Sequence, residues 1–252
     1  MSKRALITGA TVGIGYSFAR LLASEGYDLI INARSVDKLE ERALTLRKKY
    51  GINVEILPAD LATECEKVEA FIASNQIDVL INNAGFGLNQ SFLSSSIEDE
   101  QRVLDVLVRA PMRLMHAIAP QMHKRNSGVI LNVSSTAAYI AGGHYSAAKA
   151  YLTVLSESLH TQFAGTDVKI SSLNPGFTHT EFHQRAGMKM GGLPNFMWLE
   201  SDFLVKRAWS DACKGKAISI PGWQYKVLRL IIALAPRRIV RKMGMSLRTK
   251  QR

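Results

Sequence analysis

The stretch from Ala5 to Gly15, ALITGATVGIG, decides the fold: a short apolar run leads directly into three closely spaced glycines. A strand that ends in such a loop and runs into a helical pattern is typical of a nucleotide site. Glycine lets backbone N–H groups approach a pyrophosphate at the helix N-terminus, where a β-carbon would collide. The spacing GxxxGxG differs from GxGxxG, and a tight turn without a ligand is the alternative interpretation. The loop residues expected to contact the phosphates are Gly9, Thr11, Gly13, Ile14 and Gly15.

Beyond this stretch, the chain alternates short, β-branched apolar runs with longer segments of helical period. That alternation is typical of βαβ units, whose parallel sheet is covered by helices on both faces. We therefore predict a single α/β domain with a Rossmann-type, doubly wound parallel sheet of about seven strands. The expected strands are residues 5–8, 28–33, 54–58, 79–82, 129–134, 168–173 and 217–220. The expected helices lie near residues 14–25, 36–49, 62–74, 98–124 and 144–163.

Composition limits the class of protein. Of 252 residues, 47% are hydrophobic and 21% charged, which excludes a disordered, collagen-like or coiled-coil chain. No apolar run reaches the roughly 18 to 20 residues of a membrane-spanning helix, and no signal-peptide pattern precedes the glycine loop, so a cytoplasmic protein is expected. Cys65 and Cys213 lack a CxxC spacing and are expected to be free thiols.

The net charge of +11 is concentrated near the C-terminus. The last acidic residue is Asp211, and the chain up to that point carries 21 bases and 21 acids. A protein surface that binds nucleic acid would spread its Lys and Arg side chains over one face, with aromatic residues between them. Nucleic acid is therefore not the expected partner. The excess is carried by Lys214, Lys216, Lys226, Arg229, Arg237, Arg238, Arg241, Lys242, Arg248, Lys250 and Arg252.

The second expected strand ends in the sequence INARS, residues 31–35, with no acid at its tip. An acid there usually holds the adenosine ribose hydroxyls of NAD, whereas the fork of an arginine matches a 2′-phosphate. Arg34 therefore favours NADP(H) over NAD(H), with a solvated loop arginine as the alternative. Asp60, after the third strand, can accept a hydrogen bond from the adenine amine.

Polar residues follow the later strands. The segment 82–85, NNAG, is a small, polar turn that suits the border of a cofactor. Ser134 and Ser135 end the fifth strand, where a hydroxyl can hydrogen-bond a substrate carbonyl. Tyr145 and Lys149 stand four apart in a helical segment and share a face, so the ammonium is expected to lower the pKa of the phenol. Each feature alone is compatible with an ordinary turn or helix surface.

Together, the glycine loop, NNAG, the strand-end serines and YxxxK occur in an order that resembles the short-chain dehydrogenase/reductase family over nearly the whole chain. The resemblance implies an NAD(P)-dependent oxidoreductase in which Tyr145 is the general acid/base, Lys149 binds the nicotinamide ribose and lowers the pKa of the tyrosine, and Ser135 orients the carbonyl. Ser135 is preferred to Ser134 because the family places its serine second in such a pair.

The stretch NPGFTHT, residues 174–180, resembles the family's turn whose backbone and final threonine contact the nicotinamide carboxamide. A plain Pro-Gly turn is the alternative. The remaining cofactor contacts that we expect are Leu61, Asn83, Ala84, Gly85, Pro175, Gly176, Thr178 and Thr180.

Two departures from the family pattern bear on catalysis. The gap from Ser135 to Tyr145 is shorter than usual, which predicts a trimmed active-site loop. Aligning residues 103–114, VLDVLVRAPMRL, with the family's long central helix puts Leu107 where an asparagine usually supports a water-mediated proton relay. Leucine neither donates nor accepts, so protons must reach Tyr145 through Lys149, the ribose hydroxyl and a differently held water, or catalysis is slow.

The histidines suggest no metal site. His179 and His183 can share a helical face, but Glu181 would point elsewhere and the sequence offers no third ligand. His144, beside Tyr145, is expected to shape the site rather than to act as an acid.

By resemblance, apolar side chains surround the substrate, and a lid at about residues 178–198 follows them. Met and aromatic side chains repack around varied shapes, which favours a bulky ketone/alcohol pair such as an acyl-chain or steroid-like carbonyl; ordinary core packing is the alternative. The expected pocket residues are Phe86, Phe92, Tyr139, Ile140, Phe177 and Phe182, and the lid carries Met188, Met190, Phe196, Met197 and Trp198.

Residues 223–252 form a basic, amphipathic extension after a main body at residues 1–222. Apolar residues repeat at helical spacing up to Pro236, and bases flank the apolar residues that follow. Such helices can lie on an anionic membrane surface, close over the substrate pocket, pack against a second subunit or expose a solvated basic face. The apolar repeat consists of Trp223, Val227, Leu230, Ile231 and Leu234.

We therefore predict an NADP(H)-dependent carbonyl reductase or alcohol dehydrogenase that acts on an apolar small molecule, and the resemblance implies a homodimer or homotetramer. The alternative is an NADPH-binding protein with weak or lost catalysis that acts through its basic tail at a membrane surface or an acidic partner. Leu107 favours this alternative, whereas the intact set of Ser135, Tyr145 and Lys149 argues against it.

Overall fold

The computed structural model describes residues 2–88, 90–182, 187 and 194–251. Its centre is a seven-stranded sheet in the order β3-β2-β1-β4-β5-β6-β7, and every neighbouring pair is parallel. The predicted doubly wound α/β architecture is thereby confirmed. The strands are β1 (Arg4–Thr8), β2 (Asp28–Ala33), β3 (Val54–Pro58), β4 (Val79–Asn82), β5 (Gly128–Val133), β6 (Val168–Leu173) and β7 (Ile218–Ser219).

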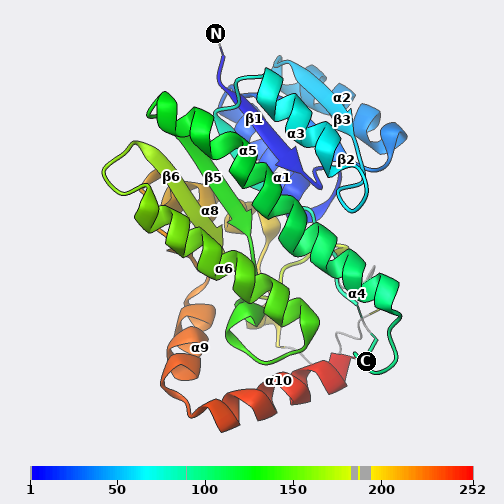
Figure 1. The fold of residues 1–252 in the computed structure, drawn as a ribbon, viewed down its shortest axis with the longest axis vertical. Coiled ribbons are helices and arrows are strands. Elements are labelled where there is room, and N and C mark those ends of the chain that lie inside the picture. The colour runs from blue at the N-terminus through cyan, green and yellow to red at the C-terminus, as the bar shows by residue number, and fades with distance from the viewer. Residues whose placement is uncertain (1, 89, 183–186, 188–193, 252) are drawn as a thin grey trace.

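Helices cover both faces of this sheet, and in Figure 1 α5 and α6 cross the face turned toward the viewer. The helices are α1 (Gly13–Ser24), α2 (Val36–Tyr50), α3 (Cys65–Ser74), α4 (Ile97–Leu104), α5 (Ala110–Lys124), α6 (His144–Gln162), α8 (Ser201–Cys213), α9 (Trp223–Leu234) and α10 (Arg237–Gln251). None of the helices in the described part of the chain is long and apolar enough to cross a membrane.

The sheet separates two apolar cores because successive side chains of a strand point to opposite faces. Ile7 of β1 and Ile31 of β2 pack in the core that contains α1, α2 and α8. Their neighbours Leu6 and Ile30 pack in the core that contains α3, α5 and α6. Burial on both faces explains why the strands are continuous apolar runs rather than alternating ones.

The strand order creates a switch point between β1 and β4, which connect to opposite halves of the sheet. Ile7 pairs with Ile31 of β2 and with Ile81 of β4, so the carboxyl ends of these three strands lie level with one another. Ligands of open α/β sheets bind outside the carboxyl ends of the strands at such a point. The glycine loop, Arg34 and NNAG therefore meet at one edge.

Two helical features differ from the expectations. The single helix expected at residues 98–124 is divided into α4, a π-helical turn (Asp105–Arg109) and α5, and the turn contains Leu107. The helix α8 was not predicted, although its buried apolar residues recur at helical spacing. They are Leu204, Val205, Ala208, Trp209 and Ala212.

Truncating the core under α1 tests this packing. Phe18 is 0% exposed, so Phe18→Ala should lower the free energy of unfolding by about 3–5 kcal/mol through lost apolar burial and a residual cavity. Urea unfolding measures the change. The control is Leu44→Ala on α2, whose side chain is 66% exposed and whose loss should cost less than about 0.5 kcal/mol. Equal effects of the two variants would contradict the packing of Phe18.

Candidate active site

The glycine loop brings the backbone of β1 against the start of α1. Gly9 has φ +65°, and a Cβ on Gly15 would lie 2.3 Å from the Gly9 carbonyl oxygen and 2.4 Å from Asn83 Nδ2. The N-cap residue of α1, Val12, makes no side-chain cap hydrogen bond, and the first turn has no acid. Free N–H groups at a helix N-terminus bind anions. The loop therefore fits a pyrophosphate.

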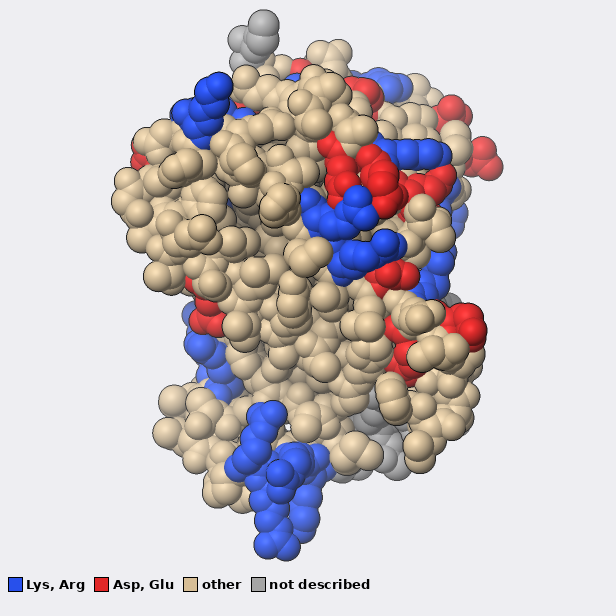
Figure 2. Space-filling model, in the orientation of Figure 1, with Lys and Arg blue, Asp and Glu red and all other residues tan. Residues whose placement is uncertain are grey.

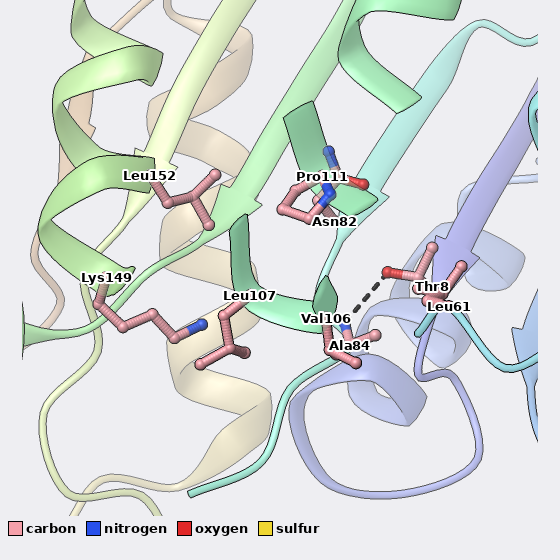
Figure 3. A pocket seen from close by; sticks show the side chains of 9 residues that line it. All are labelled: Thr8, Leu61, Asn82, Ala84, Val106, Leu107, Pro111, Lys149 and Leu152. Atoms are coloured by element: carbon pink, nitrogen blue, oxygen red, sulfur yellow. Dashed lines mark hydrogen bonds between the residues drawn. The ribbon is translucent and has the colours of Figure 1, made fainter. Parts of the chain in front are cut away.

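Thr8 and Asn83 lock this loop to the NNAG segment. The Thr8 hydroxyl oxygen accepts from the backbone N–H groups of Asn83 and Ala84, each at 3.0 Å, and Figure 3 draws the second bond. In return, Asn83 Nδ2 donates to the carbonyl oxygens of Thr8, at 2.9 Å, and Gly9, at 3.1 Å. Sequence analysis assigned no role to Thr8, because a threonine at a strand end has no distinctive pattern.

Arg34 is exposed at the carboxyl end of β2 and acts electrostatically on Asp60. Burial raises the pKa of Asp60, but hydrogen bonds from Arg102 and from the Ala62 N–H, together with the charges of Arg102 and Arg34, hold it below its usual value. One Asp60 oxygen lies 2.6 Å from Arg102 Nη2, and the other accepts from the Ala62 N–H at 3.0 Å. Both oxygens thus already have partners before any contact with adenine.

A second basic residue, Arg42 of α2, supports the glycine loop. Its Nε donates to the Thr11 carbonyl oxygen at 3.1 Å, and its guanidinium lies 4.6 Å from the ring centre of Tyr16. No sequence signal marked Arg42, because the contact joins α2 to a loop that lies far from it in the chain.

Ser135, Tyr145 and Lys149 come together beyond the end of β5. The Ser135 side chain lies close enough to Tyr145 to lower the pKa of the phenol, and its hydroxyl oxygen accepts from the Ala137 N–H at 3.0 Å. Lys149 Nζ donates to the Val133 carbonyl oxygen at 2.7 Å and lies 5.7 Å from the centre of the Tyr145 ring. Ser134 is 2% exposed and its hydroxyl is bonded to α6, where it donates to the Lys149 carbonyl oxygen at 2.7 Å. Ser135 is thus the serine of the pair that contacts the tyrosine.

Burial is the largest influence on the pKa values of Tyr145 and Lys149. It raises the pKa of Tyr145 to about 12, against a smaller lowering by the hydrogen bond with Ser135, and it lowers the pKa of Lys149 to about 8. The expected lowering of the Tyr145 pKa by Lys149 is not found, since the ammonium is turned to the Val133 carbonyl oxygen. Tyr145 therefore holds its proton at neutral pH.

Leu107 lies beside Lys149, as Figure 3 shows. It is 1% exposed, and a Cβ on Gly85 would lie 3.0 Å from Leu107 Cδ2 and 3.7 Å from Lys149 Nζ. Both Lys149 and Leu107 line a small cavity of about 10 Å³, roughly the space of one water. Asn82 Oδ1 is buried, has no hydrogen-bond partner among the described residues and belongs to this lining. The other lining residues are Thr8, Leu61, Ala84, Val106, Pro111 and Leu152.

The turn after β6 reaches back over the glycine loop. A Cβ on Gly13 would lie 3.3 Å from the side chain of Thr180, so this threonine packs against the loop. Thr178 is 3% exposed, and its hydroxyl donates to the Gly176 carbonyl oxygen at 3.0 Å. The Pro175 carbonyl oxygen accepts from the Thr136 N–H at 2.9 Å. Of the two expected threonines, Thr180 is the one that contacts the expected phosphate loop.

The C-terminal helices pack against this turn. The contact is made by Tyr225 of α9, a residue for which no role was expected from the sequence. The ring of Tyr225 fills the space beside Gly176, where a Cβ would lie 1.9 Å from its Cζ. Its hydroxyl accepts from the Phe177 N–H at 2.8 Å and donates to the Met197 carbonyl oxygen. From α10, Gly244 packs against the backbone of Ala141. The extension therefore packs against the turn after β6 and against the segment that precedes α6.

Aromatic side chains flank Tyr145 on this side. The ring centres of Phe182 and Tyr145 are 6.0 Å apart, and Phe86 packs in the same apolar cluster as Tyr145. Phe92 is 68% exposed and its ring meets that of His144 edge-on at 6.4 Å. Two other expected pocket residues lie near the turn and the extension. The ring of Phe177 lies 5.8 Å from that of Trp198, and the ring of Tyr139 lies 5.3 Å from the Arg229 guanidinium. The side chain of Ile140 lies beside Gly142 in its own loop.

Several predicted residues fall elsewhere. His183, Met188 and Met190 lie outside the described residues. The Nδ1 atom of His144 is hydrogen-bonded to the buried Glu100, and the ring of His179 stacks on Trp198. In residues 2–88, 90–182, 187 and 194–251, no group of three or more His, Cys, Asp or Glu side chains is placed to hold a metal ion.

Comparisons with known proteins agree with this geometry. Residues 3–190 match the family model of short chain dehydrogenases. The chain is 34% identical to a serine 3-dehydrogenase of Agrobacterium fabrum over 187 residues, which cover 72% of this chain and 74% of the relative. It is 33% identical to the NADP-dependent 3-hydroxy acid dehydrogenase of Escherichia coli over 187 residues, 70% of this chain and 73% of the relative. A short-chain dehydrogenase from Sphingobium yanoikuyae, solved in complex with NADPH, superposes with a TM-score of 0.83 at 29% identity, covering 93% of this chain and 96% of that chain.

The lowered pKa of Lys149 predicts an alkaline gain in stability. Between its folded pKa of about 8 and its ordinary value of 10.5, the unfolded chain binds a proton that the folded chain does not, so stability rises with pH. Relative to Lys149→Met, the wild-type free energy of unfolding should therefore increase by about 2 kcal/mol from pH 7.5 to pH 10. Urea unfolding at both pH values measures it, and a constant difference between the proteins would contradict the burial of an ionisable Lys149.

Proposed function

Because the chain belongs to the short-chain dehydrogenase family, we propose that it is an NADP(H)-dependent oxidoreductase that interconverts an apolar ketone and its alcohol. The observation that carries the proposal is the placement of Tyr145 between Ser135 and Lys149, beneath aromatic side chains. The arrangement provides a proton donor, a partner for the carbonyl and a positive charge at one point of an apolar mouth.

The residues present fit a dinucleotide. The glycine loop offers free N–H groups at the start of α1, and it leaves no room for a β-carbon on Gly15. Arg34 is exposed at the position where it would hold a 2′-phosphate, and Thr180 lies over the loop on the nicotinamide side. Bound there, NADP(H) supplies or accepts the hydride.

The protein's own residues manage the proton. Tyr145 is protonated at neutral pH and donates from its hydroxyl to the oxygen of the carbonyl being reduced. The Ser135 hydroxyl, beside the tyrosine, would hold the same oxygen in reach. Lys149, which donates to the Val133 carbonyl oxygen in this structure, would hold the nicotinamide ribose beside the tyrosine.

The substrate class follows from the surroundings of Tyr145. The two relatives are named for serine and for 3-hydroxy acids, whose carboxylates call for a cationic partner. Here the ring of Phe182 lies beside that of Tyr145, and Phe86 packs against the same apolar cluster as Tyr145. Such an apolar mouth favours a bulky ketone or alcohol without a charge. Homodimer or homotetramer assembly and a cytoplasmic location stay predictions.

Leu107 supports a second candidate function, a cofactor-binding protein with weak catalysis that acts through its basic tail at a membrane or an acidic partner. Its apolar side chain lies beside Gly85 and Lys149, where the family's relay would use an amide. A relay that bypasses it requires a water in the cavity beside Asn82. In this candidate, Leu107→Asn restores turnover while the isosteric Leu107→Met does not; in the reductase, both variants turn over no faster than wild type.

Removing the phenol tests the main proposal. Tyr145→Phe should reduce NADPH-dependent reduction of apolar ketones by at least about 10²-fold, because the acid is lost, and should leave NADPH binding nearly unchanged. A panel of ketones and aldehydes followed by NADPH absorbance gives the rates, and NADPH fluorescence gives the affinity. Tyr151→Phe, on the same helix and 39% exposed, is the control and should keep wild-type rates. Unchanged turnover of Tyr145→Phe would refute the assigned acid.

Arg34 sets the preference between the cofactors. Arg34→Ala should weaken NADPH binding by about ten- to a hundredfold, the effect of losing a charge-assisted hydrogen bond, and leave NADH binding unchanged. Titrations of both cofactors against Arg34→Ala and the nearby control Lys38→Ala measure the difference. Equal weakening for NADPH and NADH would remove the phosphate role of Arg34.

A further inference from the structure

The outer face of α9 carries an apolar surface that the fold does not use. Its five side chains follow the spacing i, i+4, i+7, i+8 and i+11, and we call them the α9 stripe. On the opposite face of α9, Tyr225 is 1% and Ile232 9% exposed, so the helix already buries one apolar face against the body. The exposed fractions in the stripe are Trp223 71%, Val227 48%, Leu230 61%, Ile231 54% and Leu234 78%.

Basic residues adjoin the stripe where α9 passes into α10. Arg238, Arg241 and Lys242 are exposed and follow the spacing of one helix face, opposite the buried Val240 and Gly244. Together with Arg237 they form what we call the basic corner. Figure 2 shows Lys and Arg gathered at the lower end of the molecule, over the α9–α10 corner, with the acidic side chains higher up. No Asp or Glu follows Asp211 in the sequence.

We propose that the α9 stripe and the basic corner dock the protein on an anionic phospholipid membrane. An interfacial helix buries apolar side chains at the boundary between head groups and acyl chains, while neighbouring Lys and Arg pair with anionic lipids. Trp223, at the first position of the stripe, is a residue type that prefers this boundary. The apolar α9 stripe thus matches the acyl-chain boundary of such a membrane, and the basic corner matches its anionic head groups.

Charge distinguishes the membrane from a second copy of the chain. A symmetric dimer through α9 would set one basic corner against another, with no acid after Asp211 to compensate. The stripe in turn distinguishes the membrane from nucleic acid. The phosphate backbone of a nucleic acid attracts Lys and Arg side chains. It offers no apolar environment in which Leu230, Ile231 or Leu234 could be buried.

The docking would orient the active site. Tyr225 on the inner face of α9 bonds to Phe177 and to Met197 at the substrate side, while the stripe faces outward from the same helix. A helix is about 10–12 Å across with its side chains, so the membrane would lie about one helix diameter from the turn at residues 176–177. The docking goes beyond the proposed function and does not depend on it. Delivery of an apolar substrate from the bilayer to the active site, in contrast, rests on the proposed function.

Vesicle binding tests the docking without any reference to turnover. The full-length protein is mixed with vesicles of phosphatidylcholine alone or of phosphatidylcholine with phosphatidylglycerol, and bound protein is measured by cosedimentation at low and high salt. We expect binding to the anionic vesicles at least tenfold stronger than to the neutral ones, weakened by salt. We also expect a blue shift of tryptophan emission that Trp223→Phe abolishes.

Paired variants separate the two parts of the surface. Leu230→Gln/Leu234→Gln and Arg238→Gln/Arg241→Gln should each reduce binding at least tenfold while thermal unfolding stays at the wild-type temperature. The matched controls lie on α2: Leu44→Gln, 66% exposed, and Lys38→Gln/Lys48→Gln should bind as wild type does. Binding that only the charge variant weakens would indicate nucleic-acid-like or nonspecific electrostatics and overturn the proposal.

Two further results would also overturn it. One is an absence of binding to either vesicle. The other is a wild-type dimer, measured by light scattering, that Leu230→Gln/Leu234→Gln converts to a monomer, because a second copy would then cover the stripe. Loss of turnover in Tyr145→Phe with vesicle binding intact would leave the docking in place, so failure of the two proposals can be distinguished.

Discussion

The approach of two backbone loops at the centre of the sheet is the constraint on which the rest of the site depends. Gly15, the Gly9 carbonyl and the Asn83 side chain meet at distances that no β-carbon allows, and the Thr8 hydroxyl holds NNAG against β1. This contact fixes the start of α1 and the end of β4 relative to each other. The phosphate loop and the side of the site that carries Gly85 and Leu107 are therefore one rigid piece.

Local sequence patterns were enough to predict most of the sheet and the helix face that carries Tyr145 and Lys149. The strands are apolar because both faces of the sheet are covered, so their positions were visible in the sequence to within a residue or two. YxxxK needed only helical spacing to bring Tyr145 and Lys149 to one face. The helix α8 could have been predicted from the spacing of Leu204, Ala208 and Trp209, whereas the π-turn at Leu107 depends on packing that no local pattern expresses.

Other features depended on distant contacts. The choice of Ser135 over Ser134 rested on resemblance alone, because the bond that holds the Ser134 hydroxyl on the backbone of α6 joins segments that are far apart in the sequence. The direction of the pKa shift at Tyr145 could not be predicted from spacing, because burial is a property of the assembled fold and outweighs one nearby charge. The contact of Tyr225 with Gly176 joins positions about fifty residues apart and had no signal in either segment.

The position of Tyr225 has a consequence for the order of assembly during synthesis. Chains emerge and fold from the N-terminus, and strands β1 to β6 are complete before α9 has been translated. The N–H of Phe177 in the turn after β6 donates to the hydroxyl of Tyr225, a residue of α9. A nascent chain can thus build its phosphate loop and most of its sheet early, whereas the turn at Gly176 gains its contact with Tyr225 only after α9 has been synthesised.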